Sequence, residues 1–241
     1  MEPGSGEKTG AGGGICVAVA LPDSRSAVRA VRPLLPDVDV VEIRLDAMVQ
    51  PDIPALCREI DRPLLFTNRA AWEGGACNAP EEERLESLLT AVHCGASFVD
   101  LELRTAPALR QLLLEEIESS ATRLIVSHHD FVRTPDAARL SAILREQVES
   151  GAHIGKIVTM AHDHLDVLRV LNLQGEAKRY GFPLIAFCMG EAGRISRIVT
   201  LLLGGFMTYA ALDVGQATAP GQLTVPELKA ALALLRGGSG S

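Results

Sequence analysis

The sequence contains few lysines and few aromatic residues. Four lysines occur among 241 residues, against nineteen arginines, and aromatic side chains make up 4% of the chain. Acidic residues outnumber basic ones, which gives a formal net charge of −7 at pH 7. Nucleic acids and anionic membranes are bound through basic surfaces. The composition therefore predicts neither a nucleic-acid partner nor a membrane partner.

Paired cysteines and long apolar runs are also missing from the sequence. The five cysteines form no CxxC pair and no regular spacing, which is typical of reduced thiols in a cytoplasmic protein. The longest apolar run near the N-terminus, residues 15–21, is too short to span a bilayer and follows no basic region. We therefore expect a cytoplasmic protein without a signal peptide.

Both ends of the chain have the composition of linkers. Residues 1–14 are mostly Gly, Glu, Ser, Lys and Thr, and residues 237–241 read GGSGS. Such segments bury too little apolar surface to fold, so we predict a flexible tail at each end. Residues 15–236 are expected to form one domain, because 47% of the chain is apolar and can supply a large core.

Between the tails, short apolar runs alternate eight times with amphipathic helical patterns. The strands are expected at residues 15–21, 40–45, 63–68, 98–103, 124–128, 153–159, 183–188 and 207–212. The helices are expected at residues 26–35, 53–60, 81–93, 108–119, 135–150, 165–180, 195–203 and 225–235. Nearly continuous apolar strands are typical of a parallel sheet that is covered on its outer face.

Eight β/α repeats match the size and rhythm of a (β/α)8 barrel. The competing architecture is an open doubly wound sheet, which usually carries a glycine-rich phosphate turn after a strand. No GxGxxG or GxxxxGK[ST] motif follows any expected strand here. The sequence therefore predicts a single (β/α)8 barrel, also called a TIM barrel.

Lys156 is the lysine that interrupts an apolar run, at residues 153–160. Apolar surroundings remove hydration from the charged ammonium, which increases the share of the free amine. A free amine is a nucleophile suited to attack on a ketone or aldehyde. The alternative interpretation is a lysine at a strand end that extends its ammonium into solvent.

Polar residues gather at the expected carboxyl ends of the strands, where the active sites of barrel enzymes lie. Glu42, Arg44 and Asp46 alternate along the second strand, and this spacing points all three into the barrel. Later strand ends add Arg69, Glu73, Asp100, Glu102, His129, Lys156 and Arg197. Charges inside a barrel are costly unless they are paired or functional. We interpret Asp46 and Asp100 as members of a buried salt-bridge network.

The histidines do not indicate a metal site. His128 and His129 are adjacent in a strand, so their side chains point to opposite faces and at most one faces the barrel centre. His93, His162 and His164 fall in helical or loop contexts and are interpreted as structural or surface residues. The pair His162-x-His164 lacks the carboxylate or cysteine partners that a metal would need.

As a set, the strand-end residues resemble the type I 3-dehydroquinate dehydratases of the shikimate pathway. The matching pieces occur in family order, with a step of 27 residues from His129 to Lys156. They are Glu42-x-Arg44-x-Asp46, Thr67-x-Arg69-x3-Glu73-Gly74-Gly75, Asp100-x-Glu102, Ser127-x-His129-Asp130-Phe131, Ile154-x-Lys156-Ile157, Met189-Gly190 with Ile195-Ser196-Arg197, and Ala219-Pro220-Gly221-Gln222.

The resemblance implies that 3-dehydroquinate is dehydrated to 3-dehydroshikimate through a covalent imine, without a metal or organic cofactor. Lys156 would form the imine, His129 would act as general acid and base, and Glu73 would orient His129 and support its charged form. Substrate contacts would come from Glu42, Arg44, Arg69, Arg197, Thr218 and Gln222. Among these, Arg197 would hold the substrate carboxylate through its planar fork of donors. The resemblance also suggests a homodimer.

Four positions depart from the pattern of this family. Thr218 and Ala18 stand where serines are common, Gly205 belongs to a pair that replaces Ser-Pro, and His153 replaces an aspartate. None of them belongs to the pair formed by His129 and Lys156. We expect these departures to affect affinity and local loop geometry rather than the reaction.

Three other functions are compatible with parts of the pattern. A class I aldolase-like barrel lyase would share the lysine of the sixth strand, but it usually needs a phosphate site at the last two loops. A metal-dependent barrel lyase would use the carboxylates of Glu42, Asp46, Asp100 and Glu102. A binding protein without activity would not be expected to retain Lys156, His129 and Arg197 together.

Overall fold

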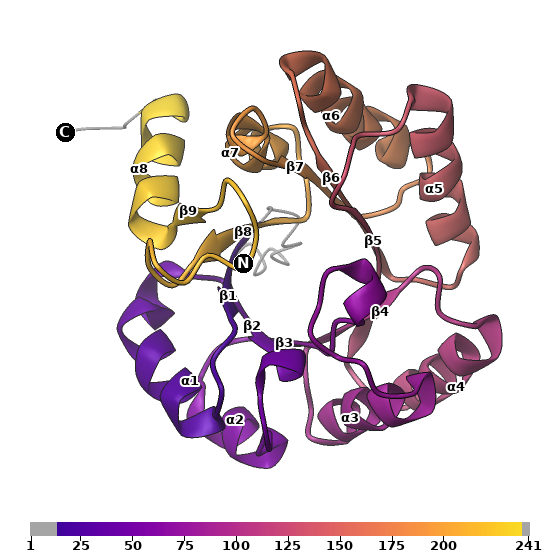
Figure 1. Cartoon of the computed structure of the whole chain (residues 1–241), viewed down its shortest axis with the longest axis vertical. Coiled ribbons are helices and arrows are strands. Elements are labelled where there is room, and N and C mark those ends of the chain that lie inside the picture. Colours follow the sequence, from indigo (N-terminus) through magenta and orange to yellow (C-terminus); the bar gives the residue numbers. More distant parts are fainter. Residues whose placement is uncertain (1–13, 238–241) are drawn as a thin grey trace, which may run out of the picture.

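The computed structural model describes residues 14–237, which form a closed ring of parallel strands inside a ring of helices (Figure 1). The sheet runs in the order β7-β6-β5-β4-β3-β2-β1-β8-β9, so consecutive strands are neighbours. Between β7 and β8, the amide of Phe206 donates to the carbonyl of Leu184 at 2.8 Å. The predicted (β/α)8 barrel is confirmed. The strands are β1 Gly14–Val19, β2 Val40–Arg44, β3 Leu64–Thr67, β4 Phe98–Glu102, β5 Arg123–Asp130, β6 Ile154–Met160, β7 Leu184–Met189, β8 Met207–Ala211 and β9 Leu223–Thr224.

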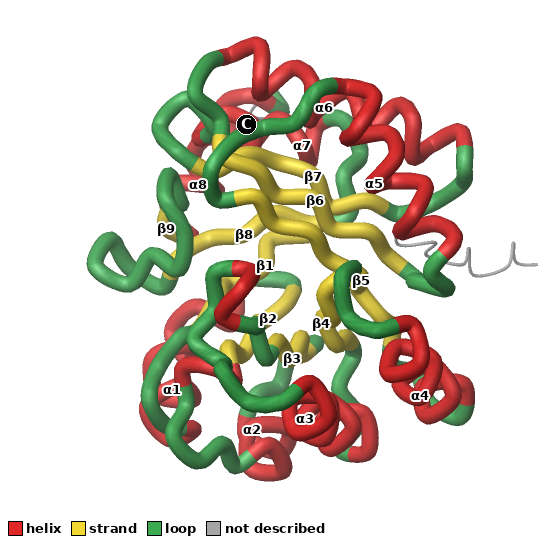
Figure 2. Tube along the Cα trace, turned by 45° about the vertical axis from the view of Figure 1, so that its right-hand side comes forward, coloured by secondary structure: helices red, strands yellow, loops and turns green. Residues whose placement is uncertain are grey.

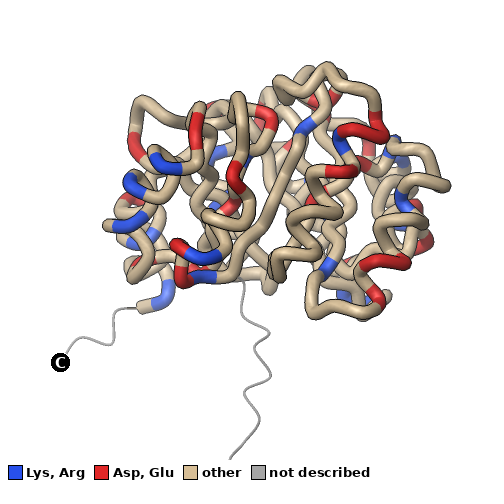
Figure 3. The backbone as a smooth tube through the Cα atoms, turned by 90° about the horizontal axis from the view of Figure 1, so that it is seen from below, with Lys and Arg blue, Asp and Glu red and all other residues tan. Residues whose placement is uncertain are grey.

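The helices lie outside the strands, as Figure 2 shows. They are α1 Ser24–Val31, α2 Ile53–Glu59, α3 Glu81–His93, α4 Pro107–Glu118, α5 Ala137–Glu149, α6 His164–Arg179, α7 Arg194–Leu202 and α8 Val225–Leu235, with 3-10 turns η1 Arg32–Asp37, η2 Leu45–Ala47 and η3 Ala71–Glu73. Acidic and basic residues are interspersed along the outer helices (Figure 3). Within residues 14–237, none of the helices has the length and apolarity that crossing a bilayer would take.

Alternation along each strand separates two layers of core. Val17 and Val19 of β1 point outward into the core shared with the helices, whereas Cys16 and Ala18 point into the barrel. The barrel interior is filled with apolar side chains from other strands, such as Leu65 and Ile185. This packing closes the barrel below the carboxyl ends of the strands, so an open site is left only at that end.

Several boundaries differ from the sequence predictions. Gly14, expected in the first tail, begins β1 and pairs with Met207 of β8. Residues 1–13 and 238–241, which make up most of the two predicted tails, lie outside the described residues. The first helix ends at Val31 and continues as the 3-10 turn η1, because Pro33 and Pro36 carry no amide hydrogen for an α-helical bond.

The second strand ends before Asp46, which corrects the prediction that three charged groups point into the barrel. The strand stops at Arg44, and Asp46 lies in the 3-10 turn η2. There it pairs with Arg44 at 2.6 Å and accepts from the amides of Arg69 and Ala76. Asp46 therefore fixes the loop after β3, in agreement with the salt-bridge role expected for it.

Two of the departures from the family pattern have local structural reasons. A Cβ atom on Gly205 would lie 2.6 Å from Thr200 Oγ1 and 2.8 Å from the Thr200 carbonyl, so the close approach to α7 requires glycine. The imidazole of His153 accepts from the amide of Leu124 through Nδ1 at 3.0 Å. Both contacts lie near the amino ends of strands, far from the open end of the barrel.

The start of α8 depends on a capping box. Thr224 Oγ1 accepts from the amide of Glu227, and Glu227 Oε2 accepts from the amide of Thr224 at 2.8 Å. This cap satisfies two amide hydrogens that the helix itself leaves unpaired. It also fixes the chain two residues after Gln222, at the end of the loop that follows β8.

Replacing Thr224 by Ala should lower the unfolding free energy by about 1 kcal/mol, because the amide of Glu227 loses its partner. Urea denaturation of both proteins measures this difference. The matched control is Thr90→Ala, an exposed threonine inside α3 whose hydroxyl donates to the carbonyl of Glu86. A loss in Thr224→Ala no larger than in Thr90→Ala would contradict a stabilising role for the cap.

Candidate active site

A hollow at the carboxyl end of the barrel brings together all nine residues that the sequence analysis selected. They reach it from β2, from the loop after β3, from β5 and β6, from α7, and from the loop after β8. The nine are Glu42, Arg44, Arg69, Glu73, His129, Lys156, Arg197, Thr218 and Gln222. Phe131, Phe187, Met189 and Tyr209 add apolar lining.

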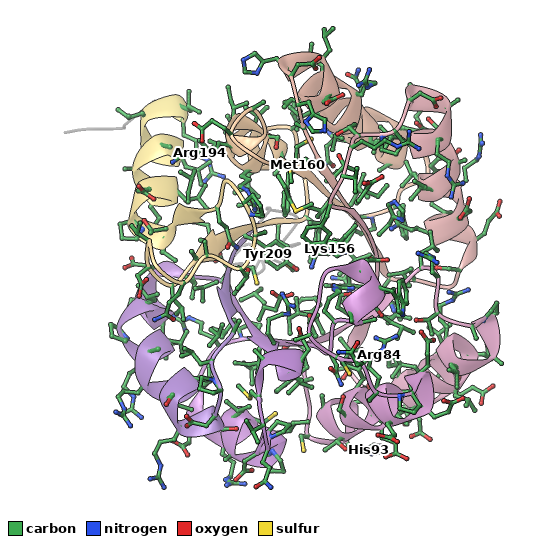
Figure 4. All side chains as sticks on the ribbon, viewed as in Figure 1. Arg84, His93, Lys156, Met160, Arg194 and Tyr209 are labelled. Carbon is green, nitrogen blue, oxygen red and sulfur yellow. The ribbon has the colours of Figure 1, made fainter. Side chains whose placement is uncertain are left out.

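Lys156 lies on the floor of this hollow, near the barrel centre (Figure 4). Its side chain is 5% exposed, and Nζ lies 3.0 Å from Asp100 Oδ2 and 3.6 Å from Glu42 Oε1. The face of the Tyr209 ring lies 4.2 Å from Nζ. The surroundings are thus more polar than the apolar strand predicted, because two carboxylates face the nitrogen. Lys156 must lose a proton before its nitrogen can act as a nucleophile.

Asp100 is held as a carboxylate by the cations around it. Arg69 donates to Asp100 Oδ1 at 2.8 Å, and Ser127 donates to the same oxygen at 2.6 Å. Burial alone would raise the pKa of Asp100, but the charges of Arg69 and Lys156 outweigh burial and keep it well below its usual range. Asp100 therefore provides a fixed negative charge beneath Lys156.

Glu42 is oriented by a neighbouring strand. Thr67 of β3 donates its hydroxyl to Glu42 Oε1 at 2.9 Å, and this oxygen also faces Lys156. Both side chains are buried, so the contact fixes the carboxylate at one edge of the hollow.

His129 and Glu73 form a buried pair on the wall of the hollow. Glu73 Oε1 lies 2.9 Å from Nδ1 of His129 and accepts from the backbone amide of His129 at 3.0 Å. When Nδ1–H donates to Glu73, the other ring nitrogen, Nε2, carries a lone pair that Glu73 does not contact. Nε2 can then accept a proton. The ring of Phe131 stacks over the imidazole, with centroids 6.2 Å apart.

Burial disfavours charge on both members of this pair. It lowers the pKa of His129 well below the usual value, and the positive charges of Arg69 and Lys156 lower it further. Burial also raises the pKa of Glu73 to about 8, against the opposing effect of Arg69. The imidazole is therefore neutral at physiological pH and ready to accept a proton, with less support for its charged form than the sequence analysis expected.

Arg197 is a buried cation with an apolar neighbour and few hydrogen bonds. Its side chain packs on the ring of Phe187 at 4.7 Å and donates to the carbonyl of Pro220 at 3.2 Å. Among the described residues, no carboxylate forms an ion pair with it, and Nε has no partner. Burial lowers the pKa of Arg197 to about 10, which still leaves a cation at neutral pH. This arrangement is suited to an anion in the hollow.

The loop after β8 covers one side of the hollow. Gln222 Oε1 accepts from the amide of Thr218 at 2.8 Å and from its hydroxyl at 3.2 Å, so within residues 14–237 the NH2 group of Gln222 remains free to donate. Gly221 has a φ of 75°, and a Cβ atom there would lie 2.4 Å from the carbonyl oxygen of Gly190. Only glycine lets this loop pack so closely on the end of β7.

The histidines lie as the sequence analysis expected. His129 faces the hollow, while His128 points outward, where the charged groups near it include Asp130, Arg139 and Glu146. His162 bonds through Nε2 to the carbonyl of Val132. In the part of the chain that the structure describes, no group of three His, Cys, Asp or Glu residues is placed to hold a metal ion.

The carboxylates that a metal site would use are paired with cations instead. Asp46 contacts Arg44, Asp100 contacts Arg69 and Lys156, and Glu102 contacts Arg69 and Arg84. These ion pairs already occupy carboxylate oxygens that would have to bind a metal ion. The donor set is therefore poorly suited to the metal-dependent lyase considered above.

Two residues of this region were missed by the sequence analysis. Tyr209 lies next to Lys156 and could have been found from the alternation along β8, because Met207 and Tyr209 both point into the barrel. Arg84 lies on α3, and its contact with Glu102 of β4 leaves no pattern in the sequence.

The sequence as a whole matches one protein family. A sequence model described as Type I 3-dehydroquinase matches residues 15–239. The 3-dehydroquinate dehydratase of Desulfotalea psychrophila is 42% identical over 215 residues, which cover 89% of this chain and 95% of that protein. The 3-dehydroquinate dehydratase of Thermococcus gammatolerans is 40% identical over 215 residues, with the same coverage of 89% and 95%.

Solved structures with the same name are also similar in fold. The crystal structure of 3-dehydroquinate dehydratase from Geobacillus kaustophilus HTA426 gives a TM-score of 0.85 at 29% identity, and the match covers 95% of this chain and 93% of that chain. The type I 3-dehydroquinate dehydratase from Clostridium difficile, solved with covalently modified comenic acid, gives 0.81 at 25% identity, covering 93% and 92%.

Replacing Glu73 by Gln should change how stability depends on pH. Burial raises the pKa of Glu73 from 4.5 to about 8, so the folded chain keeps a proton that the unfolded chain has released. The stability that this proton contributes is fully present below pH 4.5 and is lost progressively as the pH rises from 4.5 to about 8. Between pH 6 and pH 9, the unmodified protein should lose on the order of 2 kcal/mol through this group, and Glu73→Gln should not.

Urea denaturation at pH 6 and pH 9 measures this difference. Glu118→Gln, an exposed position on α4, is the matched control and should keep the pH dependence of the unmodified protein. An equal loss of stability in Glu73→Gln and in the unmodified protein would show that Glu73 is not protonated in the folded state.

Proposed function

Because the chain belongs to the type I 3-dehydroquinase family, we propose that it dehydrates 3-dehydroquinate to 3-dehydroshikimate through a covalent imine on Lys156. The chain is an enzyme of the carbon–oxygen lyase class. The observation that carries the proposed mechanism is a buried lysine in a hollow that also holds the His129–Glu73 pair. That combination supplies a nucleophile and a proton carrier at one site.

In the first step, the Lys156 nitrogen attacks the ketone carbon of the substrate. The lysine nitrogen attacks as the free amine, after His129 has taken its proton, and the attack produces a carbinolamine. His129 returns that proton to the carbinolamine hydroxyl, which leaves as water, and a protonated imine remains. The Tyr209 ring and the Asp100 carboxylate both lie beside this nitrogen and favour its cationic form. A protonated imine withdraws electrons more strongly than a ketone, which makes the neighbouring C–H acidic.

In the second step, neutral His129 takes the proton from that carbon through Nε2. The electrons move toward the imine nitrogen, and the imidazolium then protonates the departing hydroxyl, which leaves as water. Glu73 keeps the Nδ1 side of the ring occupied, so the same nitrogen both accepts and returns the proton. Hydrolysis of the product imine restores the amine of Lys156.

Substrate orientation is assigned to the residues around the rim. Arg197 is the buried cation without an acidic partner among the described residues, so it is suited to the substrate carboxylate. Arg69 makes three hydrogen bonds to protein groups, which leaves two of its five donors for substrate hydroxyls. The remaining polar groups of the substrate are assigned to other side chains that line the hollow: Glu42, Arg44, Thr218 and Gln222.

Family membership favours dehydration over an aldolase-like reaction. The covalently modified comenic acid in the Clostridium difficile structure supports covalent chemistry within this family. An aldolase that acts on phosphorylated sugars would also form an imine, but its substrate would carry a phosphate instead of a carboxylate. The single buried guanidinium of Arg197 is more suited to a carboxylate, which needs one bidentate partner.

We also propose that the enzyme acts in the cytoplasm as a homodimer. The five cysteines are free thiols, which fits a reducing compartment. Four leucines on α7 and α8, or just after α7, are exposed and leave apolar surface for a second copy of the chain: Leu202, Leu203, Leu234 and Leu235.

Sodium borohydride added to the enzyme with 3-dehydroquinate should leave a stable adduct on Lys156, because it reduces the imine to an amine. Mass spectrometry of the digest locates the adduct. Lys156→Ala should show neither adduct nor turnover, while Lys178→Ala on α6 should show both. Turnover together with an unmodified Lys156 in the same sample would refute the imine mechanism.

Replacing His129 by Ala should lower kcat by roughly 10²–10⁴-fold, because proton transfer is lost from both elimination and imine hydrolysis. His128→Ala is the matched control, since that adjacent imidazole points away from the hollow, and its kcat should stay within a few-fold. Steady-state kinetics with 3-dehydroquinate measures both. Full activity in His129→Ala would remove His129 from the mechanism.

A further inference from the structure

Arg84 is a fully buried arginine that the proposed mechanism does not use. It lies on the inner side of α3, toward the barrel centre, whereas His93 of the same helix lies on the outer side (Figure 4). Its side chain is 2% exposed. Among the described residues, the lining of the hollow does not include Arg84. A buried charge this far from solvent is costly unless it serves a partner.

The main partner of Arg84 is Glu102 at the end of β4. Nη1 of Arg84 donates to Glu102 Oε2 at 2.5 Å and to the carbonyl of Asn68 at 3.0 Å, and Nη2 donates to Thr105 Oγ1 at 3.1 Å. Glu81 at the start of the helix is a weaker partner at 3.5 Å. Glu102 is thus held on one oxygen by a residue from outside the barrel.

The other oxygen of Glu102 connects to the catalytic groups. Glu102 Oε1 accepts from Arg69 at 2.8 Å, and the same Nη1 of Arg69 lies 3.8 Å from Glu73 Oε1. Glu73 in turn holds the imidazole of His129. A continuous chain of ionisable groups therefore runs from α3 to His129, with each neighbour within 4 Å.

The charges facing the Glu73–His129 pair come from four strands. Arg69 follows β3, Asp100 and Glu102 belong to β4, His128 belongs to β5, and Lys156 belongs to β6. Glu42 of β2 lies beside Lys156. Without Arg84, Arg69 would be the remaining cation paired with Glu102, although it also pairs with Asp100 and lies 3.8 Å from Glu73.

We propose that Arg84 is a positioning residue that sets the charge balance on the Glu73–His129 pair through Glu102 and Arg69. Because Arg84 balances the charge of Glu102, more of the positive charge of Arg69 is available to Glu73 and Asp100. The inference rests on the proposed function, because the pair it acts on is the proton carrier of that reaction. It adds a residue outside the hollow to the groups that determine at which pH His129 is neutral.

The sign of the effect follows from charge alone. Removing the positive charge of Arg84 makes the surroundings of the pair more negative, so protonation of the pair is favoured. Since His129 must be neutral to accept a proton, activity would then require a higher pH. Removing the negative charge of Glu102 has the opposite effect. These opposite shifts distinguish electrostatic control from a merely structural role.

The test is the pH profile of kcat/KM with 3-dehydroquinate in a set of variants. In Arg84→Met, which keeps an unbranched side chain but removes the charge, the acid limb should move to higher pH by about half to one unit. In Glu102→Gln it should move to lower pH. The double variant Arg84→Met with Glu102→Gln, and the charge-conserving Arg84→Lys, should return it close to the original position.

Arg139→Met is the matched control, because Arg139 is exposed on α5 and also pairs with a glutamate, Glu146. Its acid limb should stay where it is in the unmodified enzyme. Limbs that do not move, or that move in the same direction in Arg84→Met and Glu102→Gln, would overturn the inference. If Arg84→Met does not fold, Glu102→Gln alone tests the inference. An acid limb in Glu102→Gln that stays in place or moves to higher pH would overturn it.

The two proposals can fail separately. Turnover by the unmodified enzyme supports the proposed function whatever the variants do. If the unmodified enzyme does not turn over 3-dehydroquinate, the proposed function fails, and the charge inference is judged by NMR titration of His129 in the same variants. An unchanged His129 titration in Arg84→Met would then overturn it.

Discussion

The buried guanidinium of Arg69 lies between three carboxylates at the open end of the barrel. It bonds Asp100 and Glu102 at 2.8 Å each and lies 3.8 Å from Glu73. Burial alone would lower its pKa, but these carboxylates raise it. Each of the three then reaches a different group: Lys156, Arg84 or His129. Loss of this one cation would remove a bonded partner from both Asp100 and Glu102, which are buried and would each keep a single cation.

The parallel barrel makes such a network possible. Neighbouring strands pair Thr67 with Asp100, Glu102 with Ser127 and Ser127 with Lys156, so polar groups far apart in sequence are brought close together. The floor below them is apolar and closely packed. Water is therefore kept from the network on that side, and electrostatic effects at Lys156 and His129 are stronger than they would be on a surface.

Alternation along strands allowed much of this to be predicted from the sequence. Alternation separated His129 from His128, while nearly continuous apolar runs located the eight strands and placed Lys156 in the sixth. Alternation was also the basis for the prediction about Asp46. It was wrong for Asp46, because a 3-10 turn ends β2 at Arg44 and breaks the alternation. It could not find Arg84, since a helix position says nothing of which strand end lies opposite. The neutral state of the imidazole also depends on three-dimensional burial, which no motif encodes.

Arg69 and Arg197 show how the neighbours of a buried guanidinium determine its role. Both are almost inaccessible, but Arg69 is surrounded by carboxylates, whereas Arg197 has the Phe187 ring and one carbonyl beside it. A guanidinium that is bonded to carboxylates of the protein, as Arg69 is, stabilises the arrangement of those carboxylates. One without an acidic partner among the described residues gains most from an anion that arrives in the hollow. An acidic chain can thus attract an anionic substrate, because its cations are placed where their charge is not already balanced.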